Sequence, residues 1–272
     1  MFRNAKNGCI DLGDTQMSYV SFGAGEKSLI LLPGLSDGLT TVKGKALLLA
    51  KPYRMYFEKY TVYMFSRRDS MPKGYTICDM AEDQAKAMDL LGIREASLMG
   101  VSQGGMIAME LAINHPERIN SLVLAVTAPC ANNKLKECLQ KWISLAKEGN
   151  HKALMIDTAE KSYSAEYLKK YRKMYPLMGF IGKPASYERF LINANAIMNF
   201  DAEDRLHRIQ CPVLIIGGSE DQIVGVRASY EMHGKIPGSE ICIYRGLGHA
   251  AYEEAKDFNT RVYRFLESAG NS

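Results

Sequence analysis

Short apolar runs alternate with longer amphipathic stretches along most of this chain, and that alternation restricts its fold more than any other feature. Six runs have the length of a strand and are bounded by turn residues: 28–32, 60–65, 96–99, 121–126, 213–216 and 241–244. Strands separated by helix-length segments are typical of a mainly parallel sheet with crossover helices. The pattern therefore predicts an α/β fold.

Local turn and capping signals mark further elements. Residues 9–12 and 17–22 predict a hairpin around Gly13. Residues 76–79 fit a capping box at the start of a helix, and Gly92 is a natural left-handed residue for its end. These signals add an antiparallel hairpin and a crossover helix to the predicted sheet.

The segment 128–208 contains no convincing strand and is expected to be an insertion. Its apolar spacing predicts helices, and the ranges are 135–147, 165–174 and 187–198. Residues 1–127 and 209–272 then form the core domain. The sequence thus predicts one core interrupted by one helical segment.

Composition and charge exclude several classes of protein. The chain of 272 residues is 47% apolar and 24% charged, so it can bury a large core. Its 34 Lys and Arg against 30 Asp and Glu leave a net charge of +4, too little to indicate nucleic-acid binding. The basic run 169–173 lies among tyrosines, but helical phasing separates the two sets of side chains, as on a solvated helix. No nucleic-acid partner is expected.

The six cysteines are scattered, without a C-x-x-C pair or the spacing of metal ligands, so no metal site is predicted. No apolar stretch has the length of a signal peptide core or the roughly 18 residues of a membrane span. We therefore expect a cytoplasmic protein with free thiols and no membrane partner. The sequence indicates no particular oligomeric state.

The segment 100–104, Gly-Val-Ser-Gln-Gly, matches the motif G-x-S-x-G. A buried strand precedes it, and helical spacing begins at Gly104 and continues until Pro116 stops it. A serine on such a strand-to-helix turn projects its hydroxyl above the sheet, and the helix N-terminus offers N–H groups to an oxyanion. Ser102 is therefore a candidate nucleophile in a nucleophile elbow.

With this elbow, the chain resembles the α/β-hydrolase superfamily from its first hairpin to its last helix. The resemblance implies an α/β-hydrolase fold in which the insertion 128–208 is a helical cap over the active site. It also implies a catalytic triad in the chain order serine, acid, histidine.

Two loops at strand ends supply the remaining members of such a triad. Gly-Ser-Glu-Asp follows the strand 213–216 and ends at Asp221. Gly-Leu-Gly-His follows the strand 241–244 and ends at His249. Asp221 is the candidate acid and His249 the candidate base. The neighbouring Glu220 is an alternative acid, but the G-x-x-D pattern of the family favours Asp221.

The resemblance implies an oxyanion hole made by two backbone N–H groups. One belongs to Gln103, directly after the serine. The other comes from the loop after the third strand, where the His-Gly-x of the family reads Pro33-Gly34-Leu35. Because the donor is a backbone group, the missing histidine need not remove it, and Leu35 is the matching position.

Two loops leave alternatives open. Ser36 either lines the pocket or belongs to a solvated turn. The segment 66–70 departs from the Asp-x-Arg-Gly-x-Gly-x-Ser of many relatives. Arg67 or Arg68 either recognises an acidic substrate group or lies at the surface, and a surface position is the usual one for arginine.

The resemblance implies acyl transfer from a small-molecule substrate to water, without a cofactor. An ester of small or medium size is the expected substrate. Thioesters, amides, carbon–carbon bonds and cofactor-free perhydrolysis are alternatives on the same triad. A non-catalytic ligand sensor is an alternative of another class. Six cap residues either line the pocket or pack the cap onto the sheet: Tyr163, Tyr167, Tyr171, Tyr175, Met174 and Met178.

Overall fold

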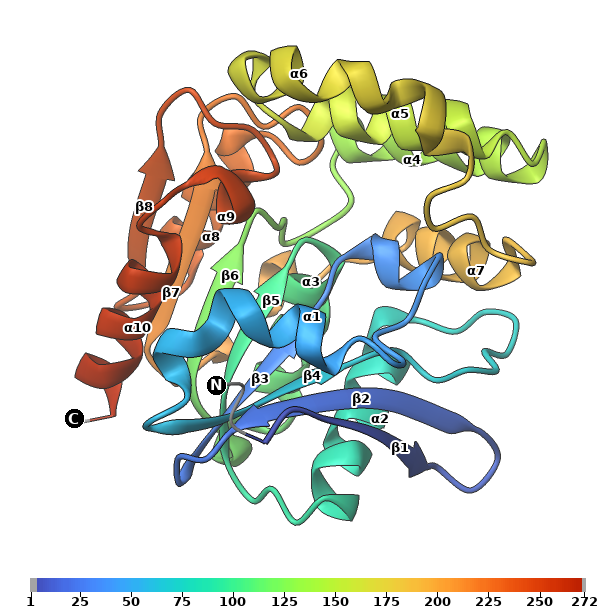
Figure 1. Cartoon of the computed structure of the whole chain (residues 1–272). Coiled ribbons are helices and arrows are strands. Elements are labelled where there is room, and N and C mark those ends of the chain that lie inside the picture. Colours follow the sequence, from blue (N-terminus) through green and yellow to red (C-terminus); the bar gives the residue numbers. More distant parts are fainter. Residues whose placement is uncertain (1–3, 271–272) are drawn as a thin grey trace.

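The structure, a computed structural model, describes residues 4–270 and is built around one eight-stranded sheet (Figure 1). The strand order is β1-β2-β4-β3-β5-β6-β7-β8. The strands are β1 (Lys6–Asp11), β2 (Gln16–Gly23), β3 (Lys27–Leu32), β4 (Tyr60–Phe65), β5 (Ala96–Val101), β6 (Ile119–Ala125), β7 (Val213–Gly218) and β8 (Glu240–Tyr244). All six strands predicted from the apolar runs are therefore confirmed.

The sheet is mainly parallel, as predicted. Strand β2 pairs antiparallel with β1 and with β4, and the remaining pairings are parallel. The β1–β2 hairpin turns at Gly13, whose φ of 98° suits a residue without a Cβ. The carboxyl ends of the parallel strands therefore share one edge, where ligand sites of α/β proteins are usually found.

Helices cover both faces of the sheet. The core helices are α1 (Ala46–Ala50), α2 (Ile77–Leu90), α3 (Gln103–Asn114), α8 (Val226–Lys235), α9 (Ala251–Glu254) and α10 (Phe258–Ala269), with 3-10 helices η1 (Leu35–Gly38), η2 (Lys51–Tyr56) and η3 (Pro116–Arg118). Side chains alternate along each strand. On β3, Ile30 faces the core that includes α2, α3 and α8, while Leu29 faces the core that includes α1 and α10. None of the helices between residues 4 and 270 has the length and apolar character needed to span a bilayer.

The segment between β6 and β7 is helical, as predicted. It contains α4 (Asn133–Lys147), α5 (His151–Ser162), α6 (Ala165–Tyr171), η4 (Arg172–Gly179), α7 (Glu188–Met198) and η5 (Glu203–Arg208). Figure 1 shows α4, α5 and α6 above the ends toward which the arrows of β5–β8 point. The insertion therefore lies over the edge of the sheet that carries the strand-end loops.

Two details of the insertion differ from the expectation. Helix α5 was not predicted; it is capped by the Asn150 side chain, which accepts a hydrogen bond from the Ala153 N–H at 3.2 Å. The helix predicted over 165–174 is α-helical only to Tyr171 and continues as the 3-10 helix η4. Pro176, inside η4, has no N–H for an α-helical hydrogen bond, which explains the change.

Candidate functional site

Ser102 lies on the sharp turn between β5 and α3. Its φ of 53° and ψ of −120° are unusual for a residue with a side chain. The neighbouring glycines are required by space, because a Cβ on Gly104 would lie 1.9 Å from the Leu32 carbonyl oxygen and one on Gly100 would lie 2.4 Å from the Gly104 carbonyl oxygen. This is the geometry of a nucleophile elbow.

The structure brings Ser102, His249 and Asp221 together, although they lie far apart in the sequence. The Ser102 Oγ is 2.9 Å from the His249 Nε2, and the His249 Nδ1 is 2.8 Å from the Asp221 Oδ2. His249 is 8% exposed and Asp221 is 3% exposed, so little water competes for these hydrogen bonds. The arrangement allows the imidazole to take a proton from the serine hydroxyl.

The carboxylate of Asp221 is fixed by its own loop. Its Oδ1 accepts hydrogen bonds from the Ile223 N–H at 2.8 Å and the Val224 N–H at 2.9 Å. Burial alone raises the pKa of Asp221, but His249 and these N–H groups outweigh burial and hold that pKa below its usual value. Asp221 is therefore ionised. The alternative acid, Glu220, is exposed and does not contact His249.

The two expected oxyanion donors both begin short helical turns beside the serine. Gln103 is the first residue of α3, and Leu35 is the first residue of η1. A Cβ on Gly34 would lie 3.9 Å from the Ser102 Oγ, so the loop that carries Leu35 lies against the serine. Within residues 4–270 neither backbone N–H has a hydrogen-bond partner. Both N–H groups therefore remain available to a substrate oxygen.

Arg67 is buried at 1% exposure, and the expectation of a surface arginine is wrong for this residue. Its Nη2 donates to the Pro33 carbonyl at 2.5 Å and to the Gln103 Oε1 at 3.0 Å. Burial lowers the pKa of Arg67 to about 10, and Asp37, 3.9 Å away, opposes that shift. The guanidinium thus joins the two loops that carry the oxyanion donors and is remote from bulk water.

Arg68 lies closer to the surface than Arg67. It forms ion pairs with Asp14 and with Asp83, the latter at 3.6 Å. Its guanidinium also lies 5.8 Å from the centre of the Tyr75 ring. These contacts hold Arg68 on the core surface and do not direct it to Ser102.

Two residues of α7 complete the network around Arg67, and the sequence did not reveal them. The Gln103 Nε2 donates to the Asn193 Oδ1 at 3.0 Å, and the Arg189 Nη2 donates to the Asp37 Oδ2 at 2.8 Å. We call Arg67, Asp37, Gln103, Asn193 and Arg189 the Arg67 network. Because Gln103 and Asn193 lie 90 positions apart, no local pattern could have indicated their contact. The network connects the elbow to a helix of the insertion.

A cavity of about 560 Å³ adjoins the serine at the α1 side of the sheet. Gly34 and Val101, both neighbours of Ser102, are among its lining residues, together with Ser36, Tyr53 and Tyr252. Ser36 therefore lines a cavity as well as being exposed, so both alternatives for this residue hold. The size is suited to a small or medium organic molecule.

Tyr163, Tyr167 and Tyr171 are not among the residues that line this cavity. The Tyr163 and Tyr167 rings stack at 4.4 Å, and the Tyr167 and Tyr171 rings stack at 4.1 Å. The Tyr163 hydroxyl donates to the Glu253 Oε2 at 2.7 Å, and Glu253 lines the cavity. The tyrosine stack thus runs outward from the rim of the cavity.

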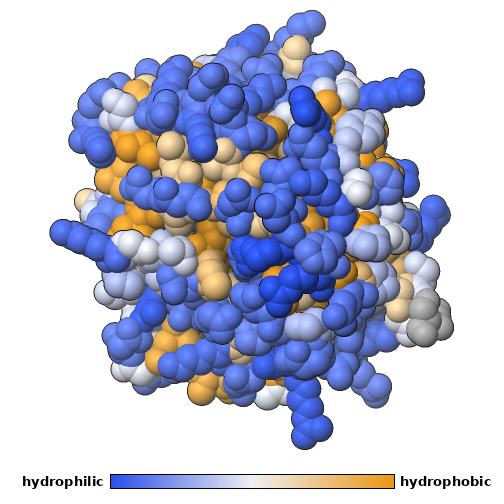
Figure 2. All heavy atoms as spheres, turned by 180° about the vertical axis from the view of Figure 1, so that it is seen from behind, coloured by the Kyte–Doolittle hydropathy of each residue, from blue (hydrophilic) through white to orange (hydrophobic). Residues whose placement is uncertain are grey.

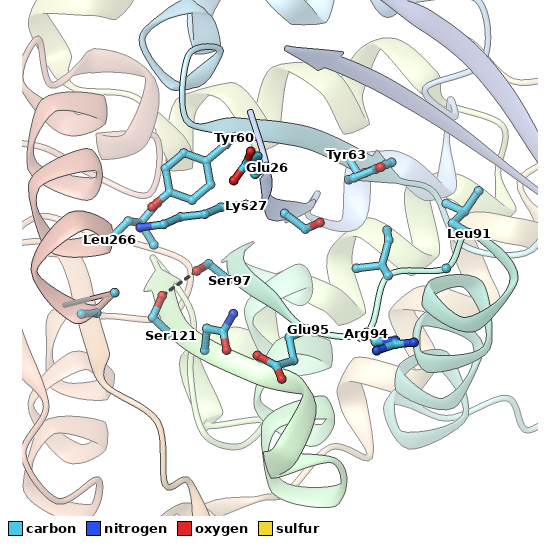
Figure 3. A pocket seen from close by; sticks show the side chains of 16 residues that line it. Glu26, Lys27, Tyr60, Tyr63, Leu91, Arg94, Glu95, Ser97, Ser121 and Leu266 are labelled. Carbon is cyan, nitrogen blue, oxygen red and sulfur yellow. Dashed lines mark hydrogen bonds between the residues drawn. The ribbon is translucent and has the colours of Figure 1, made fainter. Parts of the chain in front are cut away.

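A larger cavity, of about 670 Å³, lies at the opposite edge of the sheet, at the amino ends of the parallel strands (Figure 3). The Ser121 hydroxyl donates to the Ser97 hydroxyl at 2.9 Å in its wall. Lys27 and Arg94 line it together with Glu26 and Glu95, so its charges are mixed. It is separated from Ser102 by the length of β5.

One group of residues in the described part of the chain brings possible metal ligands within 4.8 Å of one another: Cys130, Asp201 and Glu203. The Lys235 Nζ donates to the Glu203 Oε1 at 2.6 Å, and the Cys130 Sγ donates to the Glu203 Oε2 at 3.6 Å. Contacts within the protein therefore account for this group. The chemistry of a serine triad needs no metal ion.

Comparison with known families defines the class of the protein. The family described as "alpha/beta hydrolase fold" matches residues 58–256, which include Ser102, Asp221 and His249. The chain belongs to this family, and it is a hydrolase of the α/β fold.

Particular relatives act on different bonds. The chain is 26% identical over 256 residues to a putative carbamate hydrolase RutD of Caulobacter segnis, covering 90% of this chain and 93% of that protein. It is 28% identical over 272 residues to a 2-hydroxy-6-oxononadienedioate/2-hydroxy-6-oxononatrienedioate hydrolase of Burkholderia vietnamiensis, covering 93% and 91%. The solved enol-lactonase of Burkholderia xenovorans LB400 matches with a TM-score of 0.80 at 21% identity, covering 96% of this chain and 100% of that one. These likenesses define the fold and leave the scissile bond open.

Proposed function

We propose that the protein is a serine hydrolase that cleaves an ester-type bond of a small or medium substrate through an acyl-enzyme. The observation that carries this proposal is the continuous hydrogen-bonded chain from the Ser102 Oγ through His249 to Asp221, at 2.9 and 2.8 Å. In a serine hydrolase such a chain activates the hydroxyl as a nucleophile.

Each residue has a defined role in the proposed mechanism. Ser102 attacks the substrate carbonyl while the His249 Nε2 accepts its proton, and Asp221 stabilises the imidazolium and fixes its tautomer. The Leu35 and Gln103 N–H groups bind the oxyanion. His249 then donates the proton to the leaving group, and water, activated by the same imidazole, releases the acyl group and restores Ser102.

The surroundings support the substrate class. The adjoining cavity of about 560 Å³ has apolar walls that include Met64 and Met99, with polar groups at its rim. We further propose that residues 128–208 act as a cap, because they lie above the triad and are bonded to the elbow through Asn193. The six cysteines are free, which supports the expected reducing, cytoplasmic location.

Covalent labelling tests the proposed nucleophile. A fluorophosphonate should add to Ser102 in the folded protein, and intact mass followed by peptide mapping locates the adduct. Ser102→Ala should abolish the adduct. The matched control is Ser36→Ala, which changes a serine of the neighbouring loop and should leave labelling intact. Modification elsewhere, or none, contradicts the assignment of the nucleophile.

The bond specificity needs a panel of substrates with matched acyl groups. An ester, a lactone, a thioester, an amide, a carbamate and a vinylogous diketone should be compared under one set of conditions, with Ser102→Ala as background. The proposal expects the ester or lactone to have the highest kcat/KM. A preference for the carbamate would indicate the bond specificity named for RutD. A preference for the diketone would indicate the specificity of a carbon–carbon hydrolase. Labelling without turnover of any substrate would favour a ligand sensor.

A further inference from the structure

Two segments, 40–57 and 167–187, carry an unusual distribution of charge. They contain nine of the 34 Lys and Arg and none of the 30 Asp and Glu. The rest of the chain, with 25 basic against 30 acidic residues, is net negative. The net positive charge of this chain therefore comes from these two stretches. We call the surface that they form the amphiphilic face, because it combines basic with exposed apolar side chains.

The same segments hold most of the exposed apolar side chains. Ten large apolar side chains are strongly exposed among the described residues, and eight of them belong to these segments: Leu47, Leu48, Met55, Tyr171, Met174, Leu177, Phe180 and Ile181. Phe180 is 82% exposed, and η4 buries none of its residues. Apolar side chains scattered singly over a surface are ordinary, whereas a cluster of them marks an interaction site.

The two segments meet in space. A Cβ on Gly182 would lie 3.7 Å from the Thr40 Cγ2, and the Lys45 Nζ donates to the Thr40 Oγ1 at 3.1 Å. Figure 1 shows α1 and the helical turns after α6 on the same, near side of the molecule. The reverse face is covered mostly by hydrophilic side chains, with apolar atoms between them (Figure 2). The two segments of the amphiphilic face thus adjoin at Thr40 and Gly182.

The first segment of this surface borders the cavity beside the serine. Pro52 and Tyr53, of the first segment, line the cavity. Tyr171, of the second segment, ends the tyrosine stack whose other end is bonded to Glu253 at the cavity wall. Gly34, next to Ser102, is among the residues that line the cavity. A partner on the amphiphilic face would therefore lie at the entrance to the site.

We propose that the amphiphilic face docks onto an anionic lipid surface. Lysine and arginine heads are attracted to acidic headgroups, while exposed apolar side chains between them enter the boundary of the acyl region. Neither segment contains an acidic residue. Glu160 of α5 pairs with Arg172 at 2.7 Å, so the other eight basic residues of the segments supply the charge complementarity. Peripheral docking needs no spanning helix, so it replaces the expectation of no membrane partner, which rested on the lack of such a helix. The inference does not depend on the proposed hydrolysis.

Vesicle co-sedimentation tests the proposal with the full chain. Vesicles of phosphatidylcholine with about one-third phosphatidylglycerol should bind the protein at low salt, and vesicles of pure phosphatidylcholine should bind it at least about tenfold more weakly, because several basic residues face the headgroups. Binding should fall at high ionic strength, where charges are screened.

Paired variants separate the two parts of the face. Lys170→Glu with Lys173→Glu should weaken binding about tenfold or more, because two attractive charges become repulsive. Leu48→Ser with Phe180→Ser should weaken it about tenfold through the loss of inserted apolar area. All four positions are exposed, so unchanged thermal midpoints and unchanged fluorophosphonate labelling are expected to show that fold and site are intact.

Matched controls lie outside the amphiphilic face. Leu90→Ser with Tyr230→Ser changes the two remaining strongly exposed apolar residues, and Lys136→Glu with Lys147→Glu changes two exposed lysines of α4. Neither pair should reduce vesicle binding by more than about twofold, apart from the long-range effect of net charge.

Three results would overturn the proposal. The first is the absence of binding to anionic vesicles at low salt, which would leave an acidic protein as the partner of this surface. The second is a response to the lysine variants without a response to Leu48→Ser and Phe180→Ser, which would show unspecific adsorption. The third is a dimer in sedimentation equilibrium that these two serine substitutions dissociate, which would make the face an interface between copies of this chain.

Discussion

The triad and the Arg67 network are both buried, polar and in contact with the elbow, yet they differ in how completely their atoms are paired. Both oxygens of Asp221 accept hydrogen bonds. In the network, the Arg67 Nε and Nη1 and the Asp37 Oδ1 are buried within the described structure without a hydrogen-bond partner. The triad is held by loops at the carboxyl ends of β5, β7 and β8, whereas the network joins loops to a distant helix.

That difference indicates that the triad mainly affects the reaction rate and the network mainly affects stability. A fully paired carboxylate in a local turn keeps one geometry, as proton transfer through an imidazole requires. A network that spans the core and α7 instead joins the loops of the proposed oxyanion donors to the insertion. Damage to the triad should therefore reduce rate with little loss of stability, and damage to the network should reduce stability first.

The largest effect is expected at the acid of the triad. Asp221→Asn should lower kcat by about 10²- to 10⁴-fold, because the amide cannot hold the imidazole in the tautomer that accepts the serine proton. Steady-state kinetics on the preferred ester measure it. The control is Glu220→Gln, at an exposed neighbouring position that does not contact His249, and its kcat should change less than about threefold. The reverse ranking would transfer the role to Glu220.

Removing the centre of the network should cost the most stability. Arg67→Met deletes the donors to Pro33 and Gln103 and leaves Asp37 with Arg189 as its only guanidinium partner, beside the retained backbone N–H of residue 67. The free energy of unfolding should therefore fall by about 3 kcal/mol. Urea unfolding with an unchanged m-value measures it. The exposed Arg94→Met serves as control and should change stability by less than about 0.5 kcal/mol. If Arg67→Met is as stable as the wild type, the cost of burying the unpaired atoms of Arg67 equals the stabilisation from the hydrogen bonds that it makes.

The link to α7 should have an intermediate effect, and the chain provides a close control for it. Asn193→Ala removes the Oδ1 that accepts from Gln103 at 3.0 Å and keeps the backbone carbonyl that accepts from the same Nε2 at 3.3 Å. Stability should fall by about 1–2 kcal/mol, with kcat falling several-fold as the elbow loses support. Asn195→Ala removes the same kind of local bond, to a carbonyl four residues earlier, at an exposed position of the same helix. If the two variants lose kcat equally, Asn193 acts through helix stability and not through Gln103.

Sequence patterns predicted the elements whose signals are local. The strand β5, the turn at Ser102 and the start of α3 follow one another within a few residues, and glycine spacing alone reveals their tight packing. Asp221 and His249 could be predicted because each follows a buried strand, and parallel strands bring their carboxyl ends to one edge. Local order thus determined most of the fold and identified the residues that we propose as the triad.

The features that the sequence did not predict depend on long-range contact. Arg67 reads as a surface residue because charged side chains usually are exposed, and only the assembled loops show the carbonyl and amide that it contacts. The length of α6 was overestimated because apolar spacing continues through Pro176, where hydrogen bonding changes. Burial of charge and the local type of helix are therefore properties of the complete structure.

The smallest effect is expected for an exposed polar cluster, which can be compared with the two buried groups. It consists of Glu160, Arg172 and Tyr175. The Arg172 Nε and Nη2 donate to Glu160 at 2.8 and 2.7 Å, and the Tyr175 hydroxyl donates to it at 2.7 Å. These contacts, Arg172 first, lower the pKa of Glu160 to about 2. They hold η4 against α5, but water reaches both partners, since their side chains are 35% and 51% exposed.

The sign of the pH dependence follows from that lowered pKa. The contribution of Glu160 is complete above the pKa of an unfolded glutamate, near about 4.3, and is lost as pH falls toward the folded value of about 2. Glu160→Gln should therefore raise hydrogen exchange in 165–179 only a few-fold at pH 7, because exposed ion pairs contribute little. The difference between the wild type and Glu160→Gln should shrink between pH 5 and pH 3. Glu166→Gln, an exposed change on the adjacent helix without such contacts, is the control. A larger effect of Glu160→Gln than of Asn193→Ala would show that exposure does not determine the ranking of these clusters.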